Sequence, residues 1–419
     1  MRGTWLRSAW VMALSALIVA SLATVAAAEV TTIRWLYPGG EQPVSQQTWK
    51  SQIERFAKVH PEIKVEVIDV PWDLAHDRIV NMVMAGDGPD LIQMGSRWIP
   101  EFAEMGALMP LDQYFGKEKM SLYYPGLVKT VTYKGKLYAL PRAYSTQALI
   151  YRTDLIKNPP KTWDEVVAIS KKIQSEHPGM YGLGIGGANH VSTLSQYFTI
   201  LYTYGGRVFD EQGRLQLDSP EAVAALKRYV DFYRKDKIVP NPLEYNREQL
   251  PELFSAGRIA MFVSGPWGGR ALGLPPDNDR IPYASAPVPA GPAGTATELV
   301  SDSTGIWAGT RNLKAALTFL DFITSPEEQV QRDLIGGLVP QGPTMATRPE
   351  FTKNPFFKTF IDMAPHGVPQ PQPTLWEPFQ EVIVNMVQSA TLGMVTPEQA
   401  VKQAVQELRA KGLVPAEKK

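Results

Sequence analysis

Four tryptophans of this sequence stand in loops or at the ends of predicted elements, where a large ring can meet a ligand. They are Trp72 in VPWD, Trp98 in GSRW, Trp267 in GPWGG and Trp376 in PTLWEP. Such a ring is costly to leave in water and stacks well on the apolar face of a small molecule. Packing against the protein core is the alternative for each. Flanking glycines make Trp267 the strongest candidate for the principal stacking platform, because they leave its ring face and nearby backbone N–H groups open.

The sequence lacks the common signatures of catalysis. It contains no G-x-S-x-G elbow, no Walker A loop and no H-E-x-x-H pair. Its five histidines are too scattered to suggest a metal site, and the absence of cysteine excludes thiolate ligands and thiol nucleophiles. The segment 182–187 matches G-x-G-x-x-G, but Asn189 and His190 follow it in place of a helix start. These glycines are therefore assigned to a strand and the loop that leaves it, and no cofactor is expected.

Length and charge bound the class of protein. The chain has 419 residues, with 42 Lys+Arg balanced by 42 Asp+Glu, and 44% of its residues are hydrophobic. This length argues for two or three domains with their own cores. A formal net charge of zero gives no general attraction to nucleic acid or to an anionic membrane.

The first 28 residues have the pattern of a cleavable signal peptide. Arg2 and Arg7 precede an apolar stretch from Trp10 to Ala20, and small residues lead to the alanines 26–28. An uncleaved membrane anchor is the alternative, since residues 8–28 carry no charge. We expect cleavage after Ala28 and export to the periplasm, with no cysteine to carry a lipid anchor.

The elements that must position the tryptophans alternate between strand and helix. Strands are predicted at 32–37, 63–67 and 90–94, separated by helices at about 45–59 and 74–85. This order predicts an α/β fold with a doubly wound parallel sheet that binds ligands at the carboxyl ends of its strands. Further helices should begin after four N-cap residues, of which Thr162 opens a capping box and the other three precede proline: Thr162, Ser219, Ser325 and Thr396. The proline-rich segments 275–292 and 365–378 are predicted to be ordered loops.

Taken together, short segments in a fixed order resemble the extracellular solute-binding proteins of family 1, the carbohydrate receptors of ABC importers that include maltose-binding proteins. The resemblance covers nearly all of the chain beyond the signal peptide. No piece is specific alone, but their order is. The segments are FAKVHPEIKVEV at 56–67, GDGPDLI at 86–92, GALMPLD at 106–112, LYALP at 137–141, LIYRTDL at 149–155, PKTWDE at 160–165, FSAGRIAM at 254–261 with GPW at 265–267, FLDFITSP at 319–326 and GMVTPEQA at 393–400.

The resemblance implies a two-lobe periplasmic binding protein fold, with doubly wound sheets and a ligand cleft between the lobes. The first lobe would comprise residues 29–142 and 304–342, and the second residues 146–302 and 345–419. The implied partners are a small-molecule sugar and the membrane permease subunits of an ABC importer. The implied protein is a monomer without enzymatic activity, and neither nucleic acid nor metal is expected.

The resemblance also places the ligand-binding residues. They lie in the loops after the first and third strands, in the first and second crossings between lobes, in the Gly-Pro-Trp turn and at a late helix start: Glu41, Gln42, Ser96, Arg97, Trp98, Tyr144, Ser145, Gly265, Trp267, Gly268, Ser301, Asp302 and Trp376. Trp72 borders the cleft. Ser145 stands where maltose-binding members have a cleft carboxylate, and Arg97 with Trp98 replaces an acid–base pair, which argues against malto-oligosaccharide.

Two other functions remain open. Arg97 and Arg142 would suit an anionic solute, such as a glycerol phosphate or an acidic sugar, because guanidinium groups bind phosphate and carboxylate well. Alternatively both arginines make structural ion pairs. An exported glycoside hydrolase would need two carboxylates across the cleft, for which Glu41 and Asp302 are the candidates.

Overall fold

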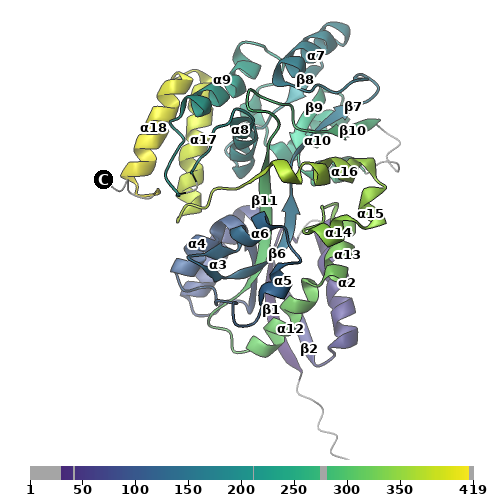
Figure 1. Ribbon diagram of the computed structural model, residues 1–419, viewed down its shortest axis with the longest axis vertical. Coiled ribbons are helices and arrows are strands. Elements are labelled where there is room, and N and C mark those ends of the chain that lie inside the picture. Colours follow the sequence, from purple (N-terminus) through teal and green to yellow (C-terminus); the bar gives the residue numbers. More distant parts are fainter. Residues whose placement is uncertain (1–29, 41–42, 211, 274–280, 415–419) are drawn as a thin grey trace, which may run out of the picture.

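The computed structural model describes residues 30–40, 43–210, 212–273 and 281–414. It has two lobes stacked along the long axis of the molecule, and two strands run between them (Figure 1). We call the part built on the amino-terminal strands the first lobe, and the part built on the other large sheet the second lobe.

The first lobe contains a six-stranded sheet in the order β12-β11-β3-β1-β2, with β6 also paired to β11. Strands β1, β2 and β3 are parallel, as the alternation of strands and helices predicts, whereas β11 runs antiparallel to β3 and β6. The strands of this sheet are β1 (Thr31–Pro38), β2 (Ile63–Val70), β3 (Leu91–Gly95), β6 (Ala139–Ser145), β11 (Thr297–Ile306) and β12 (Gly367–Pro369).

Helices cover this sheet, and a small hairpin stands beside it. They are α2 (Pro43–Val59), α3 (Trp72–Met84), η1 (Ser96–Trp98), α4 (Ile99–Glu104), α5 (Lys117–Met120), α6 (Pro125–Thr130), α12 (Leu313–Ile323), α13 (Pro326–Gly336) and α14 (Pro343–Ala346), with the hairpin β4 (Thr132–Tyr133) and β5 (Lys136–Leu137).

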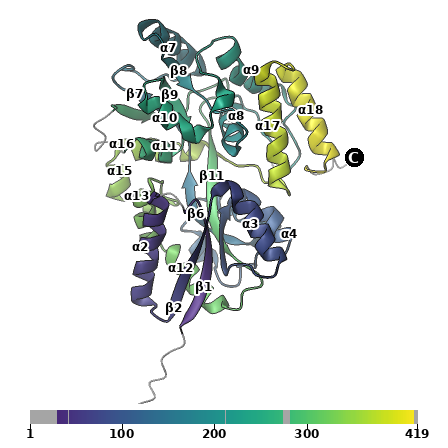
Figure 2. The same ribbon diagram turned by 180° about the vertical axis from the view of Figure 1, so that it is seen from behind.

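The second lobe is built on four strands in the order β10-β7-β9-β8, of which only β8 and β9 are parallel. Its strands are β7 (Ala148–Arg152), β8 (Tyr181–Gly184), β9 (Ile259–Ser264) and β10 (Tyr283–Ala286). Its helices are α7 (Trp163–Glu176), α8 (Val191–Thr203), α9 (Pro220–Arg234), η2 (Pro242–Glu244), η3 (Arg247–Gln249), α10 (Leu250–Ser255), α11 (Pro266–Leu272), α15 (Pro349–Thr352), α16 (Pro355–Asp362), η4 (Ala364–His366), α17 (Trp376–Leu392) and α18 (Pro397–Ala410). Seen from behind, α17 and α18 pack beside α8 and α9 at one side of this lobe (Figure 2).

Sequence patterns locate the helix starts well. Ser219, Ser325 and Thr396 each accept a hydrogen bond from the backbone N–H three residues on, and proline follows each of them. Thr162 caps its helix in the same way, but the Glu165 carboxylate accepts from the N–H of Lys161, so the predicted capping box is not closed. The first three residues of the 182–187 motif lie in β8, and the rest belong to the loop that follows this strand. The next helix begins at Val191.

The two proline-rich segments are more regular than predicted. The first contains β10, which pairs with β7, and its residues 275–280 lie outside the described residues. The second contains β12, which adds to the edge of the first sheet, and the start of α17. Pro369 is compatible with β12 because an edge strand needs no donor on its outer side.

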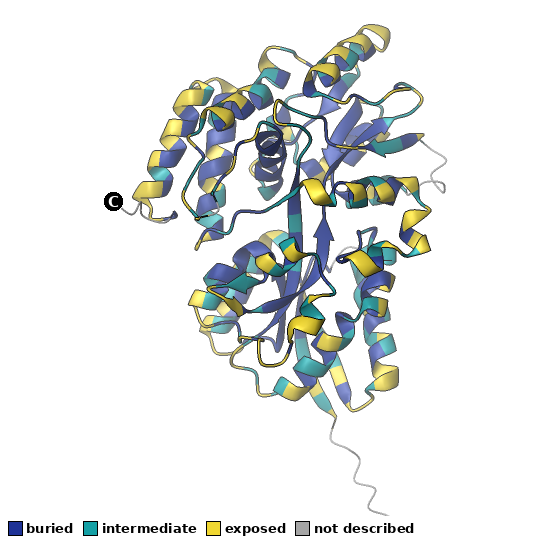
Figure 3. Ribbon diagram, in the orientation of Figure 1, coloured by how far each residue is buried: buried dark blue, intermediate teal, exposed yellow. Residues whose placement is uncertain are grey.

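One hydrophobic cluster continues from the first lobe into the second. The crossing strands β6 and β11 are buried along most of their length (Figure 3). Trp35 and Trp163 are buried in this cluster, and Trp49 packs against it. Within the described part of the chain, no helix is both long and apolar enough to cross a membrane.

The third passage between the lobes depends on a glycine. Gly342 lies just after Gln341, whose carbonyl accepts from the N–H of Tyr124, and a Cβ on Gly342 would lie 1.7 Å from the carbonyl oxygen of Leu122. We expect Gly342→Ala to destabilise the protein by about 1–3 kcal/mol, because the backbone at Leu122 or at Gly342 would have to shift to make room for the Cβ atom. Thermal or denaturant unfolding measures this loss.

Gly116→Ala is the matched control, since a Cβ there meets nothing within 4 Å and the φ of −83° suits alanine. Equal stability of the two variants would contradict the close approach at Gly342.

Candidate functional site

The predicted site residues come from segments that meet where the lobes join. Ser96, Arg97 and Trp98 form η1 directly after β3, and Trp376 begins α17. The others lie at the end of β6, within β11, at the start of α11 and at the start of α3: Tyr144 and Ser145, Ser301 and Asp302, Gly265, Trp267 and Gly268, and Trp72. Glu41 and Gln42 lie outside the described residues.

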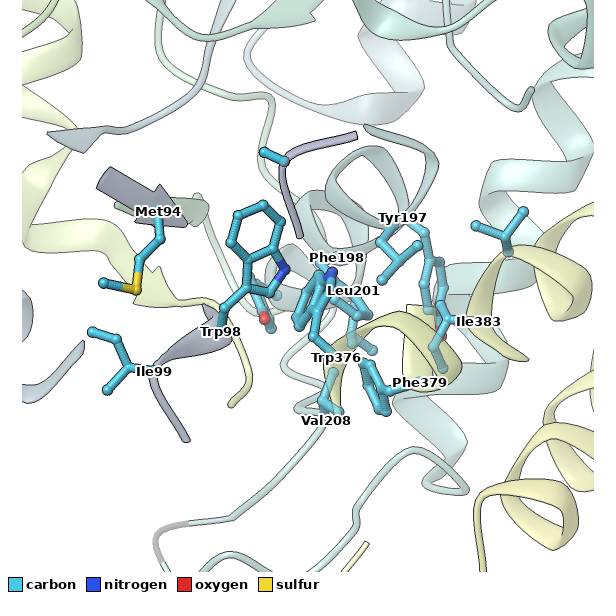
Figure 4. Close-up of a cluster of buried hydrophobic side chains, with 14 of the residues drawn as sticks. Met94, Trp98, Ile99, Tyr197, Phe198, Leu201, Val208, Trp376, Phe379 and Ile383 are labelled. Carbon is cyan, nitrogen blue, oxygen red and sulfur yellow. The ribbon is translucent and has the colours of Figure 1, made fainter. Parts of the chain in front are cut away.

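Arg97 lies between tryptophans from the two lobes. The Cζ atom of Arg97 is 4.8 Å from the ring centroid of Trp98 and 5.3 Å from that of Trp376. Both rings are almost completely buried, and Figure 4 shows them near each other within one hydrophobic cluster. A guanidinium over an indole face is favourable, especially without water.

Polar contacts between the lobes surround this stack. The indole N–H of Trp98 donates to the Glu377 carboxylate at 3.0 Å. The Gln372 amide donates to the carbonyl oxygens of Ser96 and Thr130 at 2.9 and 2.8 Å. The segment before α17 is thereby fastened to the loop after β3.

Trp72 borders the same cluster. Its ring centroid is 6.0 Å from that of Trp98, and its edge lies against Gly39, where a Cβ would be 2.7 Å away. Gly39 also has a φ of +72°, which favours glycine. The glycine after β1 therefore makes room for Trp72.

A second group of charges lies where the lobes connect. Arg142 on β6 covers the Tyr37 ring and donates to its hydroxyl, and the Gln341 amide donates to the Arg142 carbonyl at 2.6 Å. Asp333 pairs with the adjacent Arg332 in full burial. Burial raises the pKa of Asp333 to about 7, although Arg332 and Arg142 oppose the rise.

Asp302 interacts electrostatically with arginines of both groups. Burial raises the pKa of its carboxyl, while the charges of Arg97, Arg142 and Arg332 act in the opposite direction. Burial lowers the pKa of Arg97, against the influence of Asp302, Glu377 and Glu298. Arginines and carboxylates are thus interleaved along the lobe boundary.

Trp267 is half-buried, and the glycines on either side of it are closely packed. A Cβ on Gly265 would lie 2.1 Å from the Trp267 ring, and a Cβ on Gly268 would strike the Ser264 side chain at 2.7 Å. These glycines therefore make room for protein atoms, and the role of Trp267 as a stacking platform stays a prediction. Arg247 lies over the ring, with its Cζ 5.0 Å from the centroid.

The sequence patterns missed two charged residues of this region, Arg247 and Glu298. Arg247 is buried in η3 and donates from Nε and Nη2 to Glu248 at 3.2 and 2.9 Å. Glu298 is fully buried at the start of β11 and accepts from three side chains: Gln147, Ser195 and Gln370. Neither belongs to a recognisable motif, and only the buried environment identifies them.

Several buried polar atoms at this boundary have no hydrogen-bond partner. They are Arg97 Nε, Arg142 Nε, the Tyr144 hydroxyl, Ser145 Oγ, Arg247 Nη1 and Ser264 Oγ. Ser96 and Ser301 differ, because their hydroxyls bond to Ser303 and Thr130 at 3.2 and 3.0 Å. A buried polar group without a partner is costly, so this cluster is suited to a ligand rich in hydrogen-bonding groups.

Other features of the surface do not compete with this site. A cavity of about 850 Å³ between β10 and α15–α16 and another of about 410 Å³ before α9 are lined by none of the predicted site residues. Within the described ranges, no three His, Asp or Glu side chains are grouped to hold a metal ion.

The comparison with protein families identifies the chain. Residues 40–330 match the model of the bacterial extracellular solute-binding proteins. The chain belongs to this family.

Relatives of this solute-binding protein share its length and fold. A putative binding protein of Brucella abortus (strain 2308) is 28% identical over 355 residues, covering 83% of this chain and 86% of the relative. The maltotriose-binding protein of Pyrococcus abyssi is 29% identical over 348 residues, covering 79% and 71%. The structure of maltose-bound T. maritima MalE3 has a TM-score of 0.82 at 28% identity, over 91% of this chain and all of the other. A Thermotoga lettingae solute-binding protein bound to α-D-tagatose has a TM-score of 0.81 at 29% identity, over 91% and 99%.

His76 supports the Trp98 side of the site and should make it sensitive to pH. Its ring stacks on Phe102, lies edge-on to Trp98 and hydrogen-bonds to Glu101 at 3.0 Å. Burial opposes protonation, but the hydrogen bonds to Glu101 and Asp77 and the charges of Glu101 and Glu377 together outweigh it and raise the pKa of His76 above 6.5. Protonation therefore stabilises the fold below pH about 6.5, and this stabilisation is lost as the pH rises through the higher folded pKa.

We expect Glu101→Gln to destabilise the protein more at pH 6 than at pH 9, by up to about 1 kcal/mol. Unfolding curves at the two pH values, with the His76 titration followed by NMR, measure the difference. Equal destabilisation at both values would mean that Glu101 does not act through the His76 proton.

Proposed function

We propose that this chain is an exported receptor that binds a neutral sugar between its lobes and delivers it to the permease subunits of an ABC importer. One observation supports the proposal most: the predicted site tryptophans lie at the lobe boundary together with buried polar groups that have no hydrogen-bond partner. A sugar presents an apolar C–H face and a rim of hydroxyls, which suit these two kinds of group. Relatives named for maltotriose, maltose and tagatose support the same class of ligand.

Charge favours a neutral sugar over an anionic solute. Arg247 pairs with Glu248, Arg332 pairs with Asp333, and Arg97 lies in the field of Asp302, Glu377 and Glu298. The positive charge that would attract phosphate or carboxylate is thus already met by protein carboxylates. Asp302 has the same balancing role, and we assign the chain no catalytic activity.

Within this proposal the ligand-binding residues are those predicted from the resemblance. The lobes comprise residues 29–142 with 304–342 and residues 146–302 with 345–419. The crossings near residues 141–146, 303–306 and 341–344 then form the hinge. The receptor acts as a monomer in the periplasm, and its sequence has no cysteine through which a lipid could anchor it.

A panel of named solutes tests the ligand class. Glucose, tagatose, maltose and maltotriose represent neutral sugars, and glucuronate and glycerol 3-phosphate represent anions. At 100 times its Kd, a bound solute should stabilise the protein by about 2.7 kcal/mol, which raises the melting midpoint. We expect a shift with at least one neutral sugar, while a shift with the anions alone would favour the anionic alternative.

Export is tested by the mature terminus. We expect the protein, expressed with its full sequence in a bacterium that has a periplasm, to begin at Glu29 and to be released by osmotic shock. Amino-terminal sequencing and fractionation measure both properties. Recovery of protein that begins at Met1 in the membrane fraction would contradict a cleaved signal peptide.

A further inference from the structure

Arg247 is buried in a way that its visible ion pair does not explain. Its side chain is 7% exposed, whereas that of its partner Glu248 is 42% exposed. The Glu248 carboxylate accepts hydrogen bonds from Nε and Nη2 of Arg247, while Nη1 of Arg247 is buried without a hydrogen-bond partner. A guanidinium that needed only this carboxylate could make the pair in water, without the cost of burying an unsatisfied N–H group.

Arg247 is also held in place by its surroundings. Its guanidinium lies over the Trp267 ring at 5.0 Å, and its backbone N–H donates to the Ser192 hydroxyl at 3.1 Å. Asn246 and Gln249 close a capping box around η3. Burial opposes ionisation of Glu248, but Arg247 and His190 outweigh it and lower the pKa of that carboxyl, so Arg247 keeps an anionic partner.

Arg247 also interacts electrostatically with a residue of the other lobe. The charge of Arg247 acts on Arg97, which belongs to the first lobe and has its own buried, unpartnered Nε. Glu298 lies in the field of both arginines. Two buried arginines from opposite lobes therefore act electrostatically on one carboxylate.

We propose that Arg247 binds the solute directly by donating from Nη1 to a sugar hydroxyl, and that Trp267 and Glu248 position its guanidinium. This inference rests on the proposed function and deepens it. It changes the role of Trp267, whose ring supports the arginine and does not stack independently on the sugar. The ligand it fits is a neutral polyol, because Glu248 already balances the arginine charge.

Arg247→Met tests the proposal with little risk to folding, since the methionine keeps an unbranched apolar chain over Trp267 and leaves the backbone contact to Ser192 intact. Calorimetric Kd values are measured with whichever of glucose, tagatose, maltose or maltotriose binds the unmutated protein most tightly. We expect affinity to fall roughly ten- to hundredfold, as for loss of a charged hydrogen bond. Arg214→Met is the control, because Arg214 is an exposed arginine of the second lobe that pairs with Asp210.

The double variant separates the roles of the two residues. If Trp267 acts by positioning Arg247, Trp267→Ala should weaken binding to a similar extent, and Arg247→Met with Trp267→Ala should be no more than about threefold worse than either alone. Multiplied losses would mean that Trp267 contacts the sugar by itself and would overturn its positioning role.

Two further outcomes are decisive. An unchanged Kd for Arg247→Met, with a lower melting midpoint of the ligand-free protein, would make Arg247 a structural residue and overturn the inference alone. Failure of all four sugars to bind the unmutated protein would instead overturn the proposed function, and the inference with it.

Discussion

Two carboxylates buried on one strand constrain what surrounds them. Glu298 and Asp302 lie on β11, the strand that pairs with β3, β6 and β12. Removing such a charge from water costs on the order of several kcal/mol unless partners replace the solvent. Glu298 is met by hydrogen bonds from three side chains, and Asp302 by the charges of three arginines. The passage between the lobes is therefore polar inside, although the strands that form it are buried.

The arginines that balance these carboxylates also join the lobes. Arg97 comes from the loop after β3, and Trp376 comes from the first residue of α17 in the other lobe. Trp98 and Glu377 make a hydrogen bond across the same boundary. Any movement that separates the lobes must break these contacts. The position of the lobes and the arrangement of the site therefore change together. A ligand that adds hydrogen bonds in the closed arrangement shifts that equilibrium toward it.

The same groups explain how a site rich in charge can suit the neutral sugar that we propose. Each arginine has a carboxylate that contacts it or acts on it electrostatically. The groups still free to form hydrogen bonds are single N–H and O–H groups. Such groups recognise hydroxyls without attracting free anions. Aromatic rings at the same boundary supply apolar contact, and arginines already lie over three of them.

Much of the fold could be predicted from the sequence, because its signals are local. Alternating polarity marked β2, and a hydroxyl before proline marked the starts of α9, α13 and α18. The order of short segments indicated the family, which the family model confirms. The strand β12 and the unclosed capping box at Thr162 were not predicted, because they depend on a distant strand and on the geometry of a neighbouring backbone N–H.

The candidate site divides in the same way. From the sequence, element order predicted a ligand at the carboxyl ends of the parallel strands, and the family resemblance indicated the other segments of the site, including the turn before α11. Only the tertiary structure decided that the Trp267 ring packs close to Gly265, that Arg247 covers it and that Glu298 is buried beside three donors. Apart from the one between Gly265 and Trp267, these contacts join residues that are far apart in the chain, and burial, which makes their charges matter, is a property of the packed molecule and of no single segment.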